Sequence, residues 1–272
     1  MKNRISTILL ILIFLIGLSL LLYPSFSDWW NSFHQSKVIA DYAAAVAEMD
    51  EQTYEQNWSA AWEYNRSLQE RENSFVLSPE QKEQYQKLLD ISGNGVMGYV
   101  EVPSIKVTLP IYHGTSEGIL QVAIGHLPWT SLPVGGPGSH CVISGHRGLP
   151  SARLFTDLDD VVVGDVFMIR VLNEVLTYEV DQILIVDPDN VDELLIHEEK
   201  DYCTLVTCTP YGINTHRMLV RGHRIDNIEE TTKVIVTSDA MQIEPIMVAP
   251  MLAAPLLLIL LIGLIIPKKR RG

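Results

Sequence analysis

Cysteine is scarce in this sequence, which has only Cys141, Cys203 and Cys208 among its 272 residues. Exported domains that depend on disulfides usually carry more cysteines, and an even number of them. A disulfide framework is therefore excluded, and the odd count leaves at least one thiol unpaired, as a catalytic cysteine must be. The absence of CxxC pairs also argues against a thiol-redox protein.

Metal-binding patterns are missing as well. The cysteines and histidines do not fall at the spacings of zinc sites, and no clustered acidic loop of the kind that binds calcium stands out. Asp157, Asp159 and Asp160 are explained more simply as the end of a short helix. We therefore expect no metal and no other cofactor.

Basic residues are outnumbered, since 20 Lys and Arg stand against 33 Asp and Glu and give a formal net charge of −13. Six of the basic residues lie at the two ends of the chain, and removing their +6 from the total leaves −19 for the region between them. So acidic a region lacks the basic face that phosphate contacts require, which excludes nucleic acid as a partner. The charge suits a basic or lysine-bearing partner, although surface solvation explains most of it.

Two long stretches contain no charged residue, 5–22 and 246–266. Each is long enough to cross a bilayer as a helix. Lys2 and Arg4 precede the first stretch and four basic residues follow the second, so the positive-inside rule places both termini in the cytoplasm and the domain between them outside. The first stretch also fits a cleaved signal segment, for which Ser25–Ser27 offers only a weak cleavage site.

Apolar periodicity predicts a helical segment followed by a β-rich domain. Residues 36–71 show the spacing of an amphipathic helix, and a capping box between Ser78 and Gln81 opens a second helix that ends near Asp90. Beyond residue 94, many short strands and few helices are typical of a closed β-barrel. Strands are expected at 98–105, 107–113, 139–144, 166–171, 175–186, 204–207 and 218–220, and short helices at 116–123, 151–159 and 189–195.

These patterns divide the chain into six parts. They are an N-terminal membrane anchor or signal segment (1–23), a helical appendage (24–93), a β-barrel domain (94–228), a linker (229–245), a C-terminal transmembrane helix (246–266) and a basic cytoplasmic tail (267–272).

The stretch from Tyr202 to Arg224 reads as two strands joined by a turn. A β-favouring run leads to Cys208, Pro210 interrupts it, and a second β-run follows Arg217. A thiol at a rigid strand end, with a guanidinium one turn away, suits a cysteine nucleophile and a donor to the oxyanion it creates.

A cysteine nucleophile also needs a base, and His146 is the best candidate among the eight histidines because it ends a buried-type β-run at a glycine turn. An imidazolium beside a thiol favours the thiolate and can later protonate a leaving amine. We interpret His216 and His223 as structural and leave His126 and His140 unassigned.

Cys141 stands five residues before His146, and Cys203 stands five before Cys208. If the two strands are parallel neighbours, Cys141 and Cys203 lie side by side. We expect two adjacent buried thiols there rather than a disulfide, because disulfide geometry is demanding.

Two segments, SGHRGLPSARLFTDLDDV (144–161) and TLVTCTPYGINTHRMLVRGHR (204–224), closely resemble the sortases, cysteine transpeptidases of the Gram-positive cell surface. The resemblance covers roughly residues 95–225 and the membrane topology, and it is closest to class C, the pilin-polymerising sortases. Two long motifs in the right order are a specific signal. The resemblance implies a mainly β fold, a closed eight-stranded barrel with an N-terminal helical appendage, flanked by two transmembrane helices.

The resemblance also implies roles for the site residues. Cys208 is the nucleophile, His146 is the general acid and base, and Arg217 stabilises the oxyanion or the substrate carbonyl. Arg147 and Arg221 are nearby arginines of lower rank.

Two more residues are weaker candidates. Thr207, beside the nucleophile, either lines the substrate pocket or simply occupies its strand. Many class C sortases carry an Asp-Pro-aromatic motif in a lid before the barrel, but here the corresponding region reads NSFVLSP, from Asn73 to Pro79. Phe75 is a candidate lid residue, and the alternative is an ordinary loop between helices.

The implied reaction begins with attack of Cys208 on the Thr–Gly bond of an LPXTG-like sorting signal, which gives a thioacyl enzyme. In class C a pilin lysine amine then accepts the acyl group, and pili polymerise. One alternative is a sortase that anchors surface proteins to a peptidoglycan cross-bridge amine. Another, of a different class, is a catalytically silent membrane-tethered scaffold for pilus assembly. The expected location is the cell membrane, with the catalytic domain extracellular.

Overall fold

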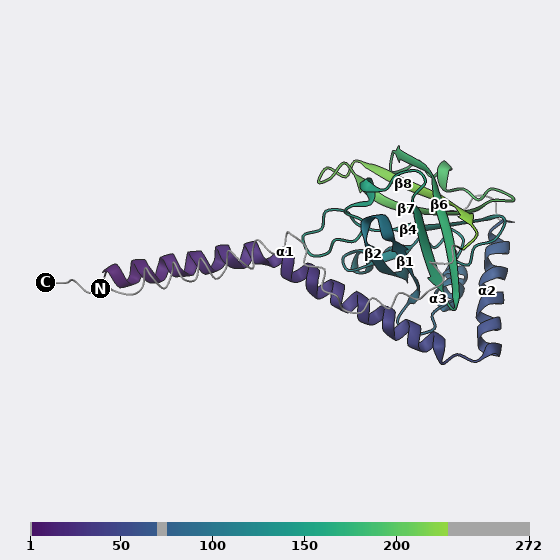
Figure 1. Ribbon diagram of the computed structural model, residues 1–272, viewed down its shortest axis with the longest axis horizontal. Helices are drawn as coiled ribbons and strands as arrows, with labels where there is room; N and C mark the ends of the chain where they lie inside the picture. Colours follow the sequence, from purple (N-terminus) through teal and green to yellow (C-terminus); the bar gives the residue numbers. More distant parts are fainter. Residues whose placement is uncertain (1, 70–74, 228–272) are drawn as a thin grey trace. The chain divides into compact units, whose positions relative to one another are not determined.

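The computed structural model describes residues 2–69 and 75–227 (Figure 1). It begins with a long helix, α1 (Lys2–Ala47). Among the described residues, α1 is the one helix that is long and apolar enough to cross a membrane, and its most apolar window is not buried against protein. The second expected span, 246–266, lies outside the described residues. The boundary between two compact units falls within α1 after Trp30, and the barrel belongs to the unit that begins at Asn31.

Two helices follow α1, namely α2 (Glu51–Gln69) and α3 (Pro79–Lys87). The prediction of one helix over 36–71 is wrong, because the chain breaks the helix at Asp50. The Asp50 carboxylate accepts hydrogen bonds from the Thr53 backbone N–H (2.8 Å) and from its hydroxyl (3.0 Å). An aspartate that caps a helix start in this way has non-helical backbone, so α2 begins anew after it.

The predicted capping box at the start of α3 is confirmed. The Ser78 hydroxyl accepts from the Gln81 backbone N–H (3.2 Å), and the Gln81 side chain accepts from the Ser78 backbone N–H (2.8 Å). The helix ends at Lys87, short of Asp90, because Leu88 is extended and Leu89 has a φ of 61°.

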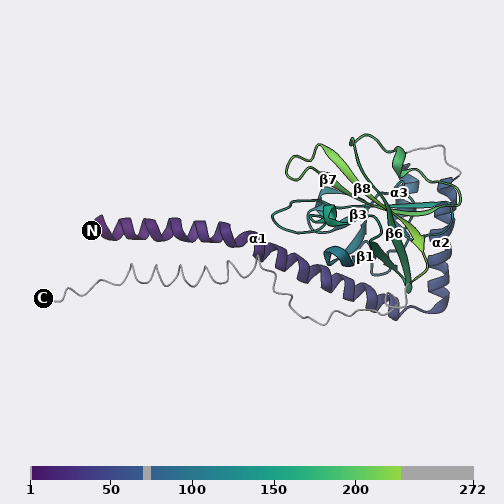
Figure 2. The same ribbon diagram turned by 45° about the horizontal axis from the view of Figure 1, so that its top comes forward.

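Eight strands form a closed barrel in the order β1-β2-β3-β4-β7-β8-β6-β5 (Figures 1 and 2). The predicted eight-stranded closed barrel is therefore confirmed. Two of its neighbours, β2 with β3 and β4 with β7, run parallel, and the others are antiparallel. The strands are β1 (Val96–Val102), β2 (Val107–His113), β3 (Ile124–His126), β4 (Ser139–Ser144), β5 (Val166–Val171), β6 (Glu174–Val186), β7 (Asp201–Thr209) and β8 (His216–Ile225).

Four predicted strands match well, and the short connections match less closely. The three-residue β3 was not predicted, and the expected helix 151–159 is wrong except for the turn η2 (Leu158–Asp160). Leu154 has a φ of 41°, which no right-handed helix accommodates. The other two expected helices, 116–123 and 189–195, shrink to α4 (Glu117–Leu120) and η3 (Asp192–Leu194). The expected strand 98–105 ends at Val102, because the turn η1 (Pro103–Ile105) begins at Pro103.

Side chains alternate between the two faces of the barrel wall. On β7, Cys203 and Leu205 are fully buried in the main core, whereas Val206 belongs to a second apolar cluster on the opposite, outer face. We call this second group the outer cluster. It consists of the buried Val142, Leu194, Val206 and Leu219, with the partly buried Leu127, Trp129, Leu184 and Val186 packed against them.

The helical appendage packs against the barrel in the unit that begins at Asn31. Tyr42 of α1 is buried, and its hydroxyl donates to the Met97 carbonyl (3.0 Å) and accepts from the Leu172 backbone N–H (2.8 Å). From α2, the buried Asn65 side chain bonds both the carbonyl and the N–H of Leu132 (3.0 and 2.7 Å). These buried polar contacts hold α1 and α2 against the barrel.

Candidate active site

Cys208 lies at the end of β7, and its register partner across the antiparallel ladder is Arg217, at the start of β8. Directly opposite residues point to the same face, with Cβ atoms about 4.5–5.5 Å apart. By alternation from Val206 and Leu219, this is the face of the outer cluster. Cys208 is a free, half-buried thiol. The predicted nucleophile and the predicted oxyanion donor therefore stand side by side on one surface.

The turn between β7 and β8 holds the Arg217 guanidinium. Nη1 donates to the carbonyls of Asn214 (3.3 Å) and His216 (3.1 Å). Asn214 has a φ of 60°, a conformation that asparagine tolerates better than most residues, and its N–H is bonded to the Pro210 carbonyl (2.9 Å). Two backbone carbonyls, that of Asn214 in the turn and that of His216 at the first position of β8, thus orient the guanidinium.

His146 reaches the same end of the barrel through β4. The register of the parallel β4 and β7 pairs Ser144 with Val206, and the Gly145 N–H continues it by donating to the Val206 carbonyl (3.0 Å). His146 follows Ser144 by two residues, just as Cys208 follows Val206. The parallel ladder therefore brings the predicted base and the predicted nucleophile to matching ends of neighbouring strands.

Two contacts join the loops that follow His146 and Cys208. The Tyr211 ring lies against Gly148, where an added Cβ would come within 2.9 Å of the ring. The Arg147 guanidinium lies 5.7 Å from the centroid of the same ring, within the range of a cation–π contact. The sequence reasoning missed Tyr211, for which the only signal was its place in the motif.

The two lower-ranked arginines, Arg147 and Arg221, each form an ion pair with a carboxylate. Arg147 pairs with Asp159. Arg221 makes a two-pronged pair with Asp181 (3.0 and 3.1 Å) and lies 4.4 Å from the centroid of the Tyr202 ring. These contacts give both arginines structural roles and support Arg217 as the donor at the site.

The other histidines take part in separate contacts. His126 and His140 are fully buried. His126 bonds the Tyr85 hydroxyl (3.0 Å) and the Ser131 carbonyl (2.8 Å), and His140 bonds the Leu195 carbonyl (2.9 Å) and the Thr204 hydroxyl (2.7 Å). His216 faces the Asp187 carboxylate at 3.6 Å.

Thr207 does not present its side chain to the surface that carries Cys208. It is 1% exposed, and its hydroxyl donates to the Gly145 carbonyl (2.9 Å). Of the two interpretations of Thr207, a strand position is therefore favoured over a lining of the substrate pocket.

Phe75 contacts the outer cluster. Its ring meets the Trp129 ring edge to face, with centroids 4.9 Å apart, and Trp129 packs on the cluster that shares a face with Cys208. Phe75 remains 40% exposed. Trp129 could not be predicted as part of this surface, because it lies in a loop without periodicity.

The prediction that Cys141 and Cys203 are adjacent buried thiols without a disulfide is confirmed. Cys141 and Cys203 are register partners in β4 and β7, both are buried, and both are free.

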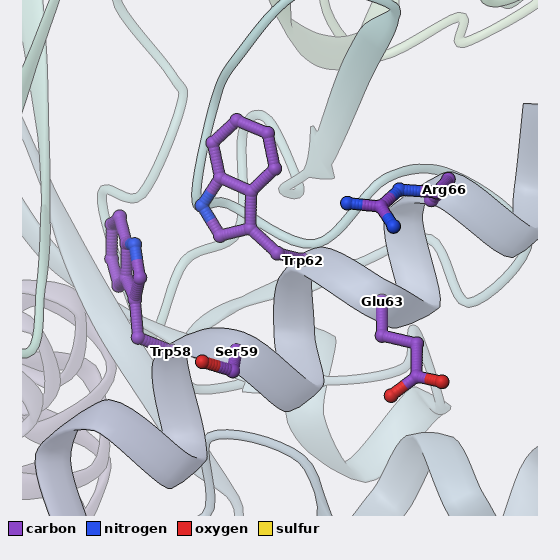
Figure 3. Close-up of a pocket in the computed structure, with 5 residues that line it drawn as sticks. All are labelled: Trp58, Ser59, Trp62, Glu63 and Arg66. Atoms are coloured by element: carbon purple, nitrogen blue, oxygen red, sulfur yellow. The ribbon is translucent and has the colours of Figure 1, made fainter.

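An open hollow occurs elsewhere, on α2. It is lined by Trp58, Ser59, Trp62, Glu63 and Arg66, and the two indole rings project from the same side of the helix (Figure 3). None of the three predicted catalytic residues lines it. Within the described residues, no group of three or more His, Cys, Asp or Glu side chains is arranged to hold a metal ion.

Comparison with known proteins agrees with this geometry. The family model for the sortase domain matches residues 100–225. The crystal structure of sortase C1 from Streptococcus agalactiae has 49% sequence identity and a TM-score of 0.69, and the match covers 71% of this chain and 100% of that one. Sortase C from Streptococcus pneumoniae has 43% identity and a TM-score of 0.62, covering 70% of this chain and 97% of that one.

A curated relative matches over a shorter stretch. Sortase D of Bacillus subtilis (strain 168) is 29% identical over 131 residues, which are 47% of this chain and 63% of that protein. The aligned stretch thus spans slightly less than two thirds of sortase D. The match to sortase C1 extends over its full length at nearly half identity. With the closed barrel and the Cys, His and Arg arrangement, it shows that this chain belongs to the sortase family of cysteine transpeptidases.

Proposed function

We propose that this protein is a class C-like sortase that transfers an LPXTG-like sorting signal to a lysine amine of a pilin. The observation that carries the proposal is the pairing of Cys208 with Arg217, at the barrel end to which the parallel β4 strand leads His146. A nucleophile, an acid–base group and a fixed cation are the groups that acyl transfer to an amine requires.

In the first half-reaction, the Cys208 sulfur attacks the threonine carbonyl carbon of the sorting signal. Negative charge develops on the carbonyl oxygen, where the Arg217 guanidinium donates hydrogen bonds. Protonated His146 gives its proton to the glycine nitrogen as the Thr–Gly bond breaks. The products are a thioester on Cys208, a free glycine amine and a neutral His146.

In the second half-reaction, the acceptor amine attacks the thioester. His146 takes a proton from the amine, and the Cys208 thiolate leaves as the new amide forms. The enzyme returns to its starting state, so no cofactor or external energy source enters the balance.

A pilin lysine as the acceptor is supported by likeness and by charge. The solved structures described above are sortases C, and the Streptococcus pneumoniae enzyme is associated with pilin substrate specificity. The region between the basic ends carries −19, which favours encounter with a lysine-bearing partner.

The proposed topology has two membrane spans with both termini in the cytoplasm. The apolar α1 and the flanking Lys2 and Arg4 support the first span, and the charge-free stretch 246–266 with the basic residues after it supports the second. The catalytic domain is then extracellular, and tethering raises its effective concentration near membrane-anchored substrates.

The acceptor separates this proposal from wall anchoring. The detergent-solubilised full chain is incubated with an LPXTG peptide and either a pilin-derived lysine peptide or a cross-bridge peptide amine. Mass spectrometry of the products should show an isopeptide bond to the lysine, and none with Cys208→Ala. Transfer only to the cross-bridge amine would indicate that the enzyme anchors surface proteins to peptidoglycan and does not polymerise pilins. If none of several sorting sequences were cleaved, the proposed transpeptidase activity would be contradicted, and a catalytically silent scaffold for pilus assembly would be favoured.

A further inference from the structure

One buried side-chain hydrogen bond ties the nucleophile's strand to the segment that carries the base. The Thr207 hydroxyl donates to the Gly145 carbonyl at 2.9 Å. Thr207 immediately precedes Cys208, and Gly145 immediately precedes His146. We propose that Thr207 is a positioning residue, which holds the Gly145 peptide so that His146 stays in place beside Cys208. This inference rests on the proposed function of those two residues.

The bond lies at the point where the β4–β7 ladder stops. The register of the two strands ends with Ser144 and Val206, and one more backbone bond joins the Gly145 N–H to the Val206 carbonyl (3.0 Å). Beyond it, the Gly145 carbonyl is held by the Thr207 side chain. The hydroxyl thus extends the connection between the strands by one residue, to the peptide that leads into His146.

Gly145 is a position where such a restraint matters. A Cβ there would come within 2.7 Å of both Ile124 and Phe155, so packing admits only glycine. Glycine is also the residue with the widest range of backbone conformations. The Phe155 N–H donates to the His146 carbonyl (3.2 Å) from the other side, so bonds on both sides of the Gly145–His146 linkage fix its direction.

Because Thr207 is buried, loss of its hydrogen bond to Gly145 is costly, and its side chain has no direct role in the chemistry. Thr207 is 1% exposed, so a carbonyl that loses this donor finds no water to replace it. Its side chain lies on the face opposite that of Cys208, by strand alternation. Thr207 therefore acts on the reaction through the Gly145 peptide and His146 and does not touch the substrate.

The test compares two substitutions in the detergent-solubilised full chain. Thr207→Val keeps the shape and removes the donor, whereas Thr207→Ser keeps the donor. A misplacement of about 1 Å costs on the order of 100-fold in rate. We therefore expect kcat of Thr207→Val to fall roughly 10- to 100-fold with little change in KM, and Thr207→Ser to stay within about threefold of wild type.

A second measurement separates positioning from a general loss of structure. Alkylation of the native protein by iodoacetamide reports on Cys208, because Cys141 and Cys203 are buried. When it is the only substitution, Thr207→Val should slow the alkylation of Cys208 at neutral pH, as His146→Ala does. In the His146→Ala background, Thr207→Val should have no further effect. If Thr207→Val unfolds, as judged by circular dichroism, the same cycle is run with Thr207→Ala.

The outcomes are distinct. Equal kcat for the Val (or Ala) and Ser variants, or equal slowing of alkylation with and without His146, would overturn the positioning role. Failure of the proposed function has another signature, since wild type would then neither cleave a sorting peptide nor respond in alkylation to His146→Ala.

Discussion

Cys208 and Arg217 are direct register partners in the second-last pair of the β7–β8 ladder, on the face that also carries the outer cluster. The ladder sets the spacing of their Cβ atoms, and the carbonyls of Asn214 and His216 orient the guanidinium. The first prediction follows from this pair.

Arg217→Lys keeps the positive charge and removes the planar fork that two carbonyls of the turn orient. Loss of one oxyanion donor lowers kcat by about 100- to 1,000-fold, and lysine replaces such a donor poorly. We expect a fall of this order in steady-state transpeptidation. Arg221→Lys is the matched control, since Arg221 pairs with Asp181, and its kcat should stay near wild type. Equal losses in both variants would contradict the role of Arg217.

Phe75→Ala tests whether the lid-region residue restricts access to Cys208. The Phe75 ring rests on Trp129, at the edge of the outer cluster, so its removal should speed alkylation of Cys208 by a reagent about the size of a peptide. Val163→Ala is the control, because Val163 is an exposed apolar residue (62% exposed) in the segment before β5 (Val166–Val171). Unchanged alkylation in Phe75→Ala would mean that Phe75 belongs to an ordinary loop.

Thiol counting tests the cysteine arrangement. The native protein should react with one equivalent of iodoacetamide, at Cys208, and the denatured protein with three, because Cys141 and Cys203 are buried and free. Cys208→Ala should show no reactive thiol when native and two when denatured. A single reactive thiol in denatured wild type would instead reveal a Cys141–Cys203 disulfide.

His140 should make stability depend on pH. Burial disfavours its imidazolium and lowers its pKa to about 4, although the bond to the Leu195 carbonyl acts in the opposite direction. Since the unfolded chain binds the proton near pH 6.5, the native state loses stability as the pH falls from 6.5 towards 4. The loss amounts to about 3 kcal/mol over this window.

Thermal unfolding at a series of pH values measures this loss. In His140→Gln, the decline in Tm between pH 6.5 and pH 4 should be shallower than in wild type. His34, an exposed histidine of α1, provides a control, and the Tm of His34→Gln should decline as that of wild type does. An unchanged slope in His140→Gln would assign the acid sensitivity to other groups.

Much of the barrel and the site was predictable from the sequence, because those signals are local. The runs that end at Ser144 and beyond Val206 are strongly β-favouring, and their matched spacing to His146 and Cys208 requires only that the strands be parallel neighbours, as they are. The capping box is likewise a local signal, because Ser78 and Gln81 are only three residues apart.

The remaining features depend on tertiary contacts. The three-residue β3 is too short to show periodicity, and it forms because β2 and β4 flank it. Asp50 interrupts an apolar pattern that continues on both sides. The outer cluster gathers residues from distant segments, so Trp129 and Phe75 meet only in the folded chain.

The most direct test of the account is a search for the covalent intermediate. The detergent-solubilised full chain is incubated with a sorting-signal peptide without an acceptor amine, quenched in acid and analysed by mass spectrometry. We predict an acyl adduct that ends at the threonine, located on Cys208 and absent from Cys208→Ala. An adduct on another residue, or cleavage of the peptide by Cys208→Ala, would contradict the assignment of Cys208 as the nucleophile.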